Sequence, residues 1–475
     1  MFKNKSNLFS SNPIQRNSGM SIFAPLGGNK YYLFVCGKEG PVGGPAPNLV
    51  YGLQNGVIQR MNAKELEDRE KPAISCIAAD ITGNGREDIY VMNSDIFSGR
   101  KYSYDKMFSY YKGSWGDLFL TEGIRNEYAS RSLCVIDRRG KGLHSILVGN
   151  NGGPLKMYEV HSNRFIEVSS QVGLGNTINN TVESILSGPI CSNKNDITIG
   201  YSRGPNTTYT LDSNLNFVPK LNTGLEDEYL SNRGMSFINL DTTGKRSIAS
   251  VNSNGENKIY VKSDDLVNCK YNDISNNPLL YNDFDMKNWK KSGDIQNIVV
   301  ADFDNDGYDE IFVNCYREPN RLFRCKNNQL IDIQEEIGDA SEPDGAATGI
   351  VVSDFDGDGL LGIFISHGGG MSQQLSYYKS VRGKYNSYLR VHVKTEWGAP
   401  ARGASVTILT NNYNRTKIID AGSTYLCQNE PVAHFGLGKY KGIVDVIVRW
   451  PDGSTARHNE ISLNQNFTVW PQNAR

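Results

Sequence analysis

The sequence contains no long hydrophobic run, and this absence excludes one class of protein. A transmembrane helix needs roughly 20 consecutive, mostly apolar residues, and no segment of the chain has that composition. Residues 1–8 are polar and lack the apolar segment of a secretory signal. We therefore predict no membrane insertion, and no signal peptide within the chain as given.

An excess of charge of either sign is also missing. The 50 Lys and Arg residues are balanced by 51 Asp and Glu residues, without a basic stripe or an acidic tail. Proteins that bind nucleic acid need a concentrated basic surface to neutralise the phosphates. The balanced charge therefore predicts that nucleic acid is not a partner.

The motifs of common enzymes are absent as well. The chain has no Gly-x-x-x-x-Gly-Lys-Ser/Thr loop, no Gly-x-Ser-x-Gly turn and no His-Glu-x-x-His motif. We predict a non-enzymatic protein with no catalytic residue and no organic cofactor. An unrecognised hydrolase-type activity is the alternative, with His434 as its candidate residue. A structural histidine near a buried network of Arg402, Glu430 and Asp452 is the simpler interpretation.

The eight cysteines lack any Cys-x-x-Cys pair, which argues against a zinc site. Four of them lie in or beside apolar runs, where a free Cys acts as a small hydrophobe: Cys36, Cys76, Cys134 and Cys315. Cys315 and Cys325 flank a hairpin-like stretch and are candidates for a bridge. Disulfides would favour secretion, and free thiols an intracellular or organellar location. Five sequons permit glycosylation: Asn4, Asn179, Asn206, Asn414 and Asn466.

The residues that are abundant indicate β structure. The chain has 48 Gly and 25 Tyr, and its short apolar runs are separated by clusters of Gly, Asn, Asp and Ser. Long amphipathic helical patterns are scarce. This combination is typical of an all-β protein.

One stretch, residues 302–310 (DFDNDGYDE), carries the clearest chemistry. Carboxylates alternate along it, and Gly307 permits the sharp turn that would curl them around one ion. Ca²⁺ takes six to eight oxygen ligands, which such a loop can supply. The predicted ligands are the side chains of Asp302, Asp304, Asp306 and Glu310 and the carbonyl of Tyr308. A carboxylate-rich turn without metal is the alternative.

A near copy follows at residues 354–359 (DFDGDG). Its predicted Ca²⁺ ligands are Asp354, Asp356, Asp358 and the carbonyl of Leu360, but Gly362 replaces the ninth-position carboxylate. Neither loop is an EF-hand, because the twelfth position holds Val313 or Ile365 instead of Glu, and a β-type run follows instead of a helix.

Similar units recur along the chain at intervals of about 50 to 65 residues, each with a β-run, a turn and a second β-run. They span residues 20–35, 74–92, 132–149, 185–200, 233–251, 298–314 and 349–366. Radial repetition protects the sheet edges of such units. We therefore predict a seven-bladed β-propeller over residues 1–384, with a large sandwich as the alternative. Residues 385–475 lack acidic turns and are expected to form a small β-sandwich-like domain.

The other turns are weaker metal sites. Asp80 is accompanied by Thr82, Asn84 and Asp88, which offer fewer charges. Asp137 is followed by Lys141, which would repel Ca²⁺ and is expected to pair with Asp137 instead. The turn from Asn239 to Gly244 is poorer still. We expect these turns to be retained for their geometry.

The acidic loops resemble the FG-GAP, or VCBS, repeats of integrin-type propellers. The last ninety residues resemble the ASPIC/UnbV domain through four segments: 398–404 (GAPARGA), 422–431 (GSTYLCQNEP), 434–438 (HFGLG) and 450–453 (WPDG). The combination resembles the cartilage acidic protein family over nearly the whole chain. That resemblance implies a secreted or cell-surface glycoprotein that binds Ca²⁺ and other proteins. Vertebrate members carry a signal peptide and a Cys-rich tail that this chain lacks, which leaves an intracellular or organellar assembly as the alternative.

The leading functional hypothesis is a calcium-binding propeller that mediates protein–protein interaction or adhesion. One alternative is a structural subunit of a larger assembly, with the propeller as docking scaffold. The other is an enzyme or glycan-binding protein that uses the propeller channel.

Overall fold

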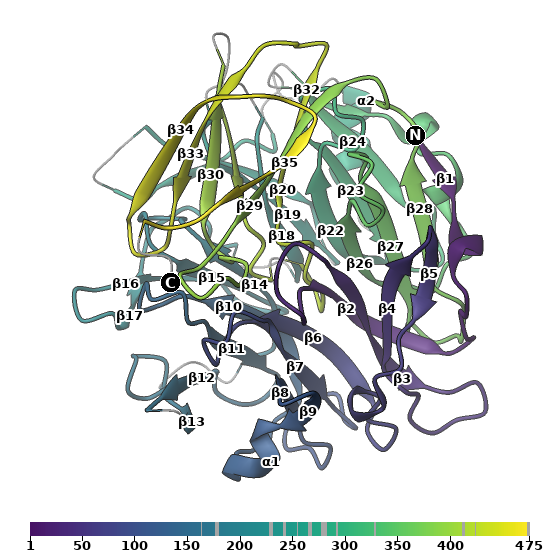
Figure 1. The fold of residues 1–475 in the computed structure, drawn as a ribbon, viewed down its shortest axis with the longest axis vertical. Helices are drawn as coiled ribbons and strands as arrows, with labels where there is room; N and C mark the ends of the chain where they lie inside the picture. Colours follow the sequence, from purple (N-terminus) through teal and green to yellow (C-terminus); the bar gives the residue numbers. More distant parts are fainter. Residues whose placement is uncertain are drawn as a thin grey trace.

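The computed structural model describes residues 1–162, 164–175, 180–227, 231–240, 244–253, 255–264, 268–276, 283–290, 293–326, 329–410, 414–422 and 424–472, without the side chains of residues 283–286. Within these residues, seven four-stranded antiparallel sheets precede the C-terminal strands. We number these sheets as blades 1 to 7. The predicted fold class, an all-β protein with a propeller-like arrangement, is confirmed (Figure 1).

Each blade is a simple up-and-down sheet, with the innermost strand first. Blade 1 contains β2 (Arg16–Phe23), β3 (Tyr32–Glu39), β4 (Leu49–Gln54) and β5 (Val57–Arg60). Blade 2 contains β6 (Ala73–Ala79), β7 (Asp88–Asn93), β8 (Lys106–Tyr111) and β9 (Ser114–Asp117). Blade 3 contains β10 (Ser130–Ile136), β11 (Ser145–Asn150), β12 (Lys156–His161) and β13 (Arg164–Glu167). Blade 4 contains β14 (Val182–Gly188), β15 (Asp196–Tyr201), β16 (Thr207–Leu211) and β17 (Phe217–Lys220).

The remaining blades follow the same order, except that the last is completed by the N-terminus. Blade 5 contains β18 (Asn232–Ile238), β19 (Ser247–Asn252), β20 (Lys258–Lys262) and β21 (Tyr271–Asp273). Blade 6 contains β22 (Ile295–Ala301), β23 (Glu310–Cys315), β24 (Arg321–Lys326) and β25 (Gln329–Asp332). Blade 7 contains β26 (Ala347–Ser353), β27 (Gly362–His367), β28 (Ser376–Ser380) and β1 (Phe2–Asn4).

Helical segments are short and lie between strands or blades. The α-helices are α1 (Leu118–Glu122) and α2 (Asp283–Lys290), and the 3₁₀ turns are η1 (Ser6–Leu8), η2 (Lys64–Leu66), η3 (Gln334–Glu336) and η4 (Asp339–Ser341). Helix α1 begins where the Asp117 carboxylate accepts a hydrogen bond from the Phe119 amide and ends at Gly123, which adopts the left-handed conformation. In the part of the chain described, no helix is both long and apolar enough to cross a membrane.

The ring is closed by contact between the first and last blades and by the N-terminal strand. The innermost strands touch in cyclic order, and β26 of blade 7 returns to β2 of blade 1. Strand β1 pairs with β28, with Phe2 opposite Ser380. The Phe2 ring packs edge-on against Phe303 at 5.1 Å between centroids. The N-terminal residues therefore hold the last blade to the rest of the chain.

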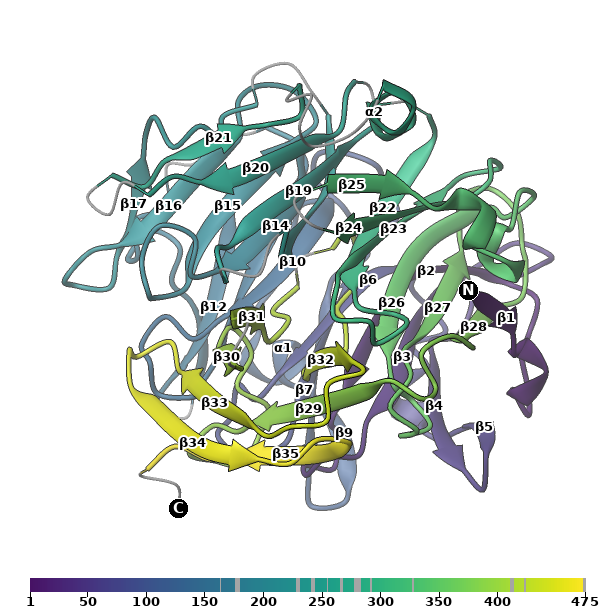
Figure 2. The same cartoon turned by 90° about the horizontal axis from the view of Figure 1, so that it is seen from above.

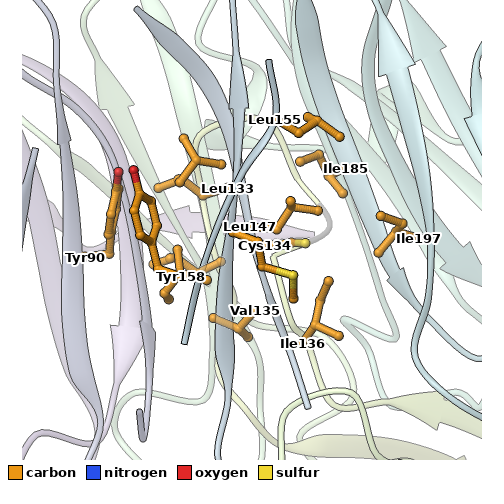
Figure 3. Packing of buried hydrophobic residues seen from close by; sticks show 14 of the residues in the cluster. Tyr90, Leu133, Cys134, Val135, Ile136, Leu147, Leu155, Tyr158, Ile185 and Ile197 are labelled. Atoms are coloured by element: carbon orange, nitrogen blue, oxygen red, sulfur yellow. The ribbon is translucent and has the colours of Figure 1, made fainter. Parts of the chain in front are cut away.

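The core lies between neighbouring blades, which explains why inner strands are apolar on both faces. Every residue of β6 and of β10 is buried, because each strand is covered by a blade on either side. Between blades 2, 3 and 4, the rings of Tyr90 and Tyr158 stack beside Leu133, Leu147 and Ile185 (Figure 3). Burial of apolar surface on this scale is the main source of stability.

The strands between Ser387 and Val469 form two further sheets on one side of the ring (Figure 2). One sheet contains β29 (Ser387–Val393), β32 (Ala433–Gly438) and β35 (Gln465–Val469). The other contains β30 (Ser405–Leu409), β31 (Asn414–Ile418), β33 (Val444–Arg449) and β34 (Thr455–Ile461). Apolar residues from both sheets share one cluster, as in a sandwich.

The chain between β31 and β32 fills the centre of the ring, and we call residues 420–422 and 424–432 the central segment. The Gln428 amide donates to the Met20 carbonyl (2.9 Å), and Ser75 donates to the Leu426 carbonyl (3.0 Å). Asn297, on the far side of the ring, donates to the Tyr425 carbonyl (2.6 Å). Because these partners lie on innermost strands of blades 1, 2 and 6, the central segment spans the ring at this level.

One disulfide, between Cys191 and Cys269, links the β14–β15 loop of blade 4 to the residues before β21 of blade 5. The suggested Cys315–Cys325 bridge is wrong, because neither cysteine forms a disulfide. In the antiparallel β23–β24 pair Val313 lies opposite Arg321, so the two cysteines lie far apart along the ladder. Among the described residues the other free cysteines are buried, as expected for small hydrophobes.

The sequons differ in access. Asn4, Asn414 and Asn466 are exposed, whereas Asn206 is buried and donates to the Leu225 carbonyl at 3.1 Å. Asn179 lies outside the described residues.

Candidate calcium site

The first acidic loop joins β22 and β23, the two inner strands of blade 6. Its backbone curls around the side chain of its first residue, Asp302. Asp302 Oδ1 accepts a hydrogen bond from the Asp306 amide (3.1 Å), and Oδ2 accepts one from Gly307 (2.8 Å). Gly307 has φ +93°, which a glycine adopts without strain. The aspartate thus folds the backbone around itself before any ion binds.

Three of the predicted ligand residues meet in this loop. Oxygens of Asp302, Asp304 and Glu310 all lie within 4.8 Å of one another, and all three residues are buried. Asp306 lies outside this close group and accepts from the Tyr308 amide (2.8 Å). The Tyr308 ring lies against Arg415, on β31, at 5.0 Å. The loop therefore gathers hard oxygen atoms of the kind that Ca²⁺ prefers.

The electrostatics of the first loop favour a cation. Burial raises the pKa of Asp302 well above its ordinary value, and the charges of Asp306 and Asp304 raise it further. Burial also raises the pKa of Glu310, with Asp304 and Asp302 adding to the effect. Carboxylates this close repel one another in a site that water reaches poorly, so a positive charge among them would be stabilising.

The protein supplies one close cation to this group. Arg324 Nε lies 2.8 Å from Glu310 Oε1, and its Nη2 lies 2.7 Å from Asp304 Oδ2. In the described part of the chain, the buried Asp302 takes part in no ion pair. Arg324 therefore pairs with three of the four predicted carboxylates, and Lys417 lies near enough to lower the pKa of Asp302.

The second acidic loop has the same backbone geometry. Asp354 Oδ1 accepts from the Asp358 amide (3.1 Å) and Oδ2 from Gly359 (2.9 Å). Asp354, Asp356 and Asp358 offer oxygens within 4.8 Å of one another. Lys379, from β28, places its ammonium among them, 2.8 Å from Asp358 Oδ1 and 2.6 Å from the Leu360 carbonyl. All four predicted ligand groups of this loop contact Lys379.

In two weaker turns the backbone also curls around the first Asp, but no cluster of carboxylates is formed. Asp80 accepts from the amides of Asn84 (3.2 Å) and Gly85 (2.9 Å), and Asp137 accepts from Lys141 (3.0 Å) and Gly142 (2.9 Å). Lys141 therefore contacts Asp137 through its backbone amide and not, as expected, through its ammonium. In the third turn residues 241–243 lie outside the described residues.

Strand β32 covers the first loop, so the site lies between the propeller and the C-terminal sheets. The Gly438 amide donates to the Asn305 carbonyl (2.7 Å), and His434 Nε2 lies 2.6 Å from Asn305 Oδ1. Asn305 Nδ2 in turn donates to the Gly359 carbonyl of the second loop (2.8 Å). His434 is buried in this contact, a position that suits a structural histidine.

Buried Arg–Glu pairs tie the C-terminal sheets to the blades. Arg402 Nε lies 2.6 Å from Glu87 Oε1, and both side chains are inaccessible to solvent. Arg390 pairs with Glu430 at 2.5 Å and with Asp354 at 3.2 Å. Of the expected buried network, Arg402 and Glu430 are buried but pair with Glu87 and Arg390 instead of with each other, and Asp452 is exposed. Sequence reasoning did not identify Glu87 as the partner of Arg402.

Comparison with known proteins agrees with these features. Residues 302–365, which include both acidic loops, match the FG-GAP-like repeat, and residues 395–475 match the ASPIC and UnbV family. Cartilage acidic protein 1 of Xenopus tropicalis is 36% identical over 94% of this chain and 72% of that protein. The Homo sapiens protein is 34% identical over 97% of this chain and 73% of its own, and the Mus musculus protein is 33% identical over 97% and 74%. The chain therefore belongs to the cartilage acidic protein family.

Proposed function

We propose that this protein is a non-enzymatic, extracellular interaction module whose propeller is stabilised by Ca²⁺ in the first acidic loop. The observation that carries the calcium proposal is the buried group of Asp302, Asp304 and Glu310, whose oxygens lie within 4.8 Å. Asp306 and the Tyr308 carbonyl would complete the protein ligands, and water the remainder of the shell. A bound ion would neutralise the carboxylates and hold the loop to its neighbours.

The position of the loop explains why such an ion would matter beyond blade 6. Asn305 joins the loop to β32 and to the second loop of blade 7. Asn386, which precedes β29, donates to the Asp304 carbonyl at 2.9 Å. An ion that orders the loop would therefore strengthen the contact between the propeller and the C-terminal sheets.

Two observations support an extracellular interaction role. The Cys191–Cys269 disulfide is of the kind that persists in oxidising compartments. On loops of blades 1 and 2, at the ends away from the acidic loops, the side chains of Val42, Phe97 and Tyr102 are 98%, 68% and 81% exposed. Isolated apolar side chains on loops are common, but several on neighbouring loops suit contact with another protein.

The calcium proposal is tested by titrating the metal-free protein with Ca²⁺ in a calorimeter and by melting it in EDTA and in Ca²⁺. We expect binding and a higher melting temperature in Ca²⁺, and a loss of both in Asp304→Asn. The interaction proposal is tested separately by capturing proteins from a matrix extract on the wild type and on the Val42→Ser/Phe97→Ser/Tyr102→Ser variant. Equal capture by the two proteins would contradict that surface.

A further inference from the structure

The two acidic loops differ in the residue that faces their ninth position. In blade 6 the ninth residue, Glu310, lies directly opposite Arg324 in the β23–β24 ladder. In blade 7 the ninth residue is Gly362, and it lies opposite Lys379 in the β27–β28 ladder. A basic residue thus occupies the same ladder position in both blades. Only in blade 7 does it face a residue with no side chain.

The two basic side chains contact different residues of their loops. Arg324 pairs with the carboxylate of Glu310 and with Oδ2 of Asp304. Among the described residues, Asp302 accepts hydrogen bonds from backbone amides and forms no ion pair. Lys379 meets no ninth-position carboxylate, and its ammonium reaches Asp354, the first residue of its loop, at 3.4 Å.

The ammonium of Lys379 takes the contacts that a bound cation would need. It lies 2.6 Å from the Leu360 carbonyl and 2.8 Å from Asp358 Oδ1, and it also pairs with Asp356. An ammonium has three protons to donate and no acceptor, so a pocket of oxygens satisfies it fully. These are the same oxygens that the spacing of the loop offers to Ca²⁺.

A second cation completes the neutralisation of Asp354. Arg390 of β29 lies 3.2 Å from Asp354 Oδ2, while Lys379 approaches Oδ1. Each carboxylate oxygen of Asp354 therefore has a backbone donor and a positive charge. In the described part of the chain no cation pairs with Asp302 in this way, although Lys417, which pairs with Asp309, is near enough to lower its pKa.

Replacement of the ammonium by Ca²⁺ is unfavourable in this setting. Lys379 is 5% exposed, and its ammonium would lose its carboxylate and carbonyl partners if it left the loop. If it stayed, two positive groups would lie a few ångströms apart in a partly dry site, where their repulsion is strong.

We propose that the ammonium of Lys379 occupies the cation position of the second acidic loop. This loop therefore binds no Ca²⁺. The Tyr377 ring fills the space that a side chain at Gly362 would take, so no ninth-position carboxylate is present to bind the ammonium. The proposal concerns blade 7 alone and does not depend on whether the first loop binds Ca²⁺.

The test removes the ammonium in a background where the first loop is disabled. Calcium calorimetry is done on Asp304→Asn and on Asp304→Asn/Lys379→Met. We expect no ion per chain in the first protein and one in the second, with the double variant melting lower in EDTA and recovering in Ca²⁺. A folded double variant that binds no Ca²⁺ overturns the proposal, as does a bound ion in Asp304→Asn that is lost when Asp358→Asn is added.

A second measurement decides the question if Lys379→Met fails to fold. In the otherwise wild-type protein, Asp358→Asn is compared with Asp304→Asn by the same titration. We expect Asp358→Asn to leave the calcium stoichiometry and affinity unchanged, because its loop holds no ion. Loss of one ion per chain in Asp358→Asn overturns the proposal, whereas loss in Asp304→Asn alone supports it. Wild-type protein that binds no Ca²⁺ refutes the proposed function and leaves the Lys379→Met test intact.

Discussion

Lys379 lies directly opposite Gly362 in the ladder between β27 and β28, and its ammonium reaches the Leu360 carbonyl at 2.6 Å. The pairing places a flexible, positively charged side chain beside the position where the first loop has the carboxylate of Glu310 and this loop has none. We therefore expect the first loop to attract a metal ion and the second to retain its own lysine.

The first prediction concerns the metal response of the first loop. Asp304→Asn is expected to abolish most of the rise in melting temperature that Ca²⁺ produces, because it removes one of the three clustered carboxylates. An ion bound only to the folded state adds about 2.7 kcal/mol when its concentration is a hundredfold above Kd. Thermal melts in EDTA and in Ca²⁺ measure the difference. Asp358→Asn is the control, and an identical loss in both variants would contradict the ranking of the two loops.

A second prediction concerns the direct repair of the second loop. Gly362→Asp restores the ninth-position carboxylate, but its Cβ would lie 2.6 Å from the buried Tyr377 ring. Overpacking of this kind costs about 1–3 kcal/mol. We expect a lower melting temperature and no additional calcium heat in calorimetry, since Lys379 still occupies the loop. Tight binding of a second ion by Gly362→Asp would show that the lysine is easily displaced.

The third prediction tests the packing of the central segment against blade 1. A Cβ at Gly19 would lie 2.7 Å from the Ser75 Cα and nearer still to the Leu426 carbonyl oxygen. Because both neighbours are backbone atoms, Gly19→Ala is expected to lower stability by about 1–3 kcal/mol. Urea unfolding measures this. Gly116→Ala, with open space around its Cβ, is the matched control and should change stability far less.

The fourth prediction is a pH dependence at the contact between blade 1 and β29. His392 bonds to Tyr31 (3.0 Å) and Asn466 (2.9 Å), and burial, aided by the charges of Arg390 and Lys394, lowers its pKa to about 4. Since the ordinary pKa is about 6.5, neutral His392 stabilises the fold above that pH, and the contribution is lost as the pH falls toward 4.

Melting curves of the wild type and His392→Gln between pH 4 and 8 test this pH dependence. The wild type is expected to exceed the variant most above pH 7, with a difference that shrinks below pH 5. Each unit of pKa depression corresponds to about 1.4 kcal/mol. His458→Gln, in β34, serves as the control. Parallel curves for the wild type and His392→Gln would refute the assignment.

Local sequence patterns were sufficient to predict the features that depend on neighbouring residues alone. The alternating carboxylates of residues 302–310 and the glycine after the third one are a property of nine neighbouring residues, and the wrapped turn follows from them. The period of the β-units likewise predicted the propeller-like fold, because each unit repeats the same strand–turn–strand pattern.

Tertiary structure alone decided the features that depend on residues far apart in the chain. Lys379 enters the second loop from β28, Glu87 meets Arg402 across the two groups of sheets, and Cys191 pairs with Cys269 across two blades. The strand at Phe2–Asn4 completes a sheet whose other strands lie near residue 360. No local spacing encodes these pairs, because ring closure and the packing of the C-terminal sheets determine which side chains meet. The sequence by itself therefore determined which loops can hold a cation, and the folded arrangement decided which cation each loop meets.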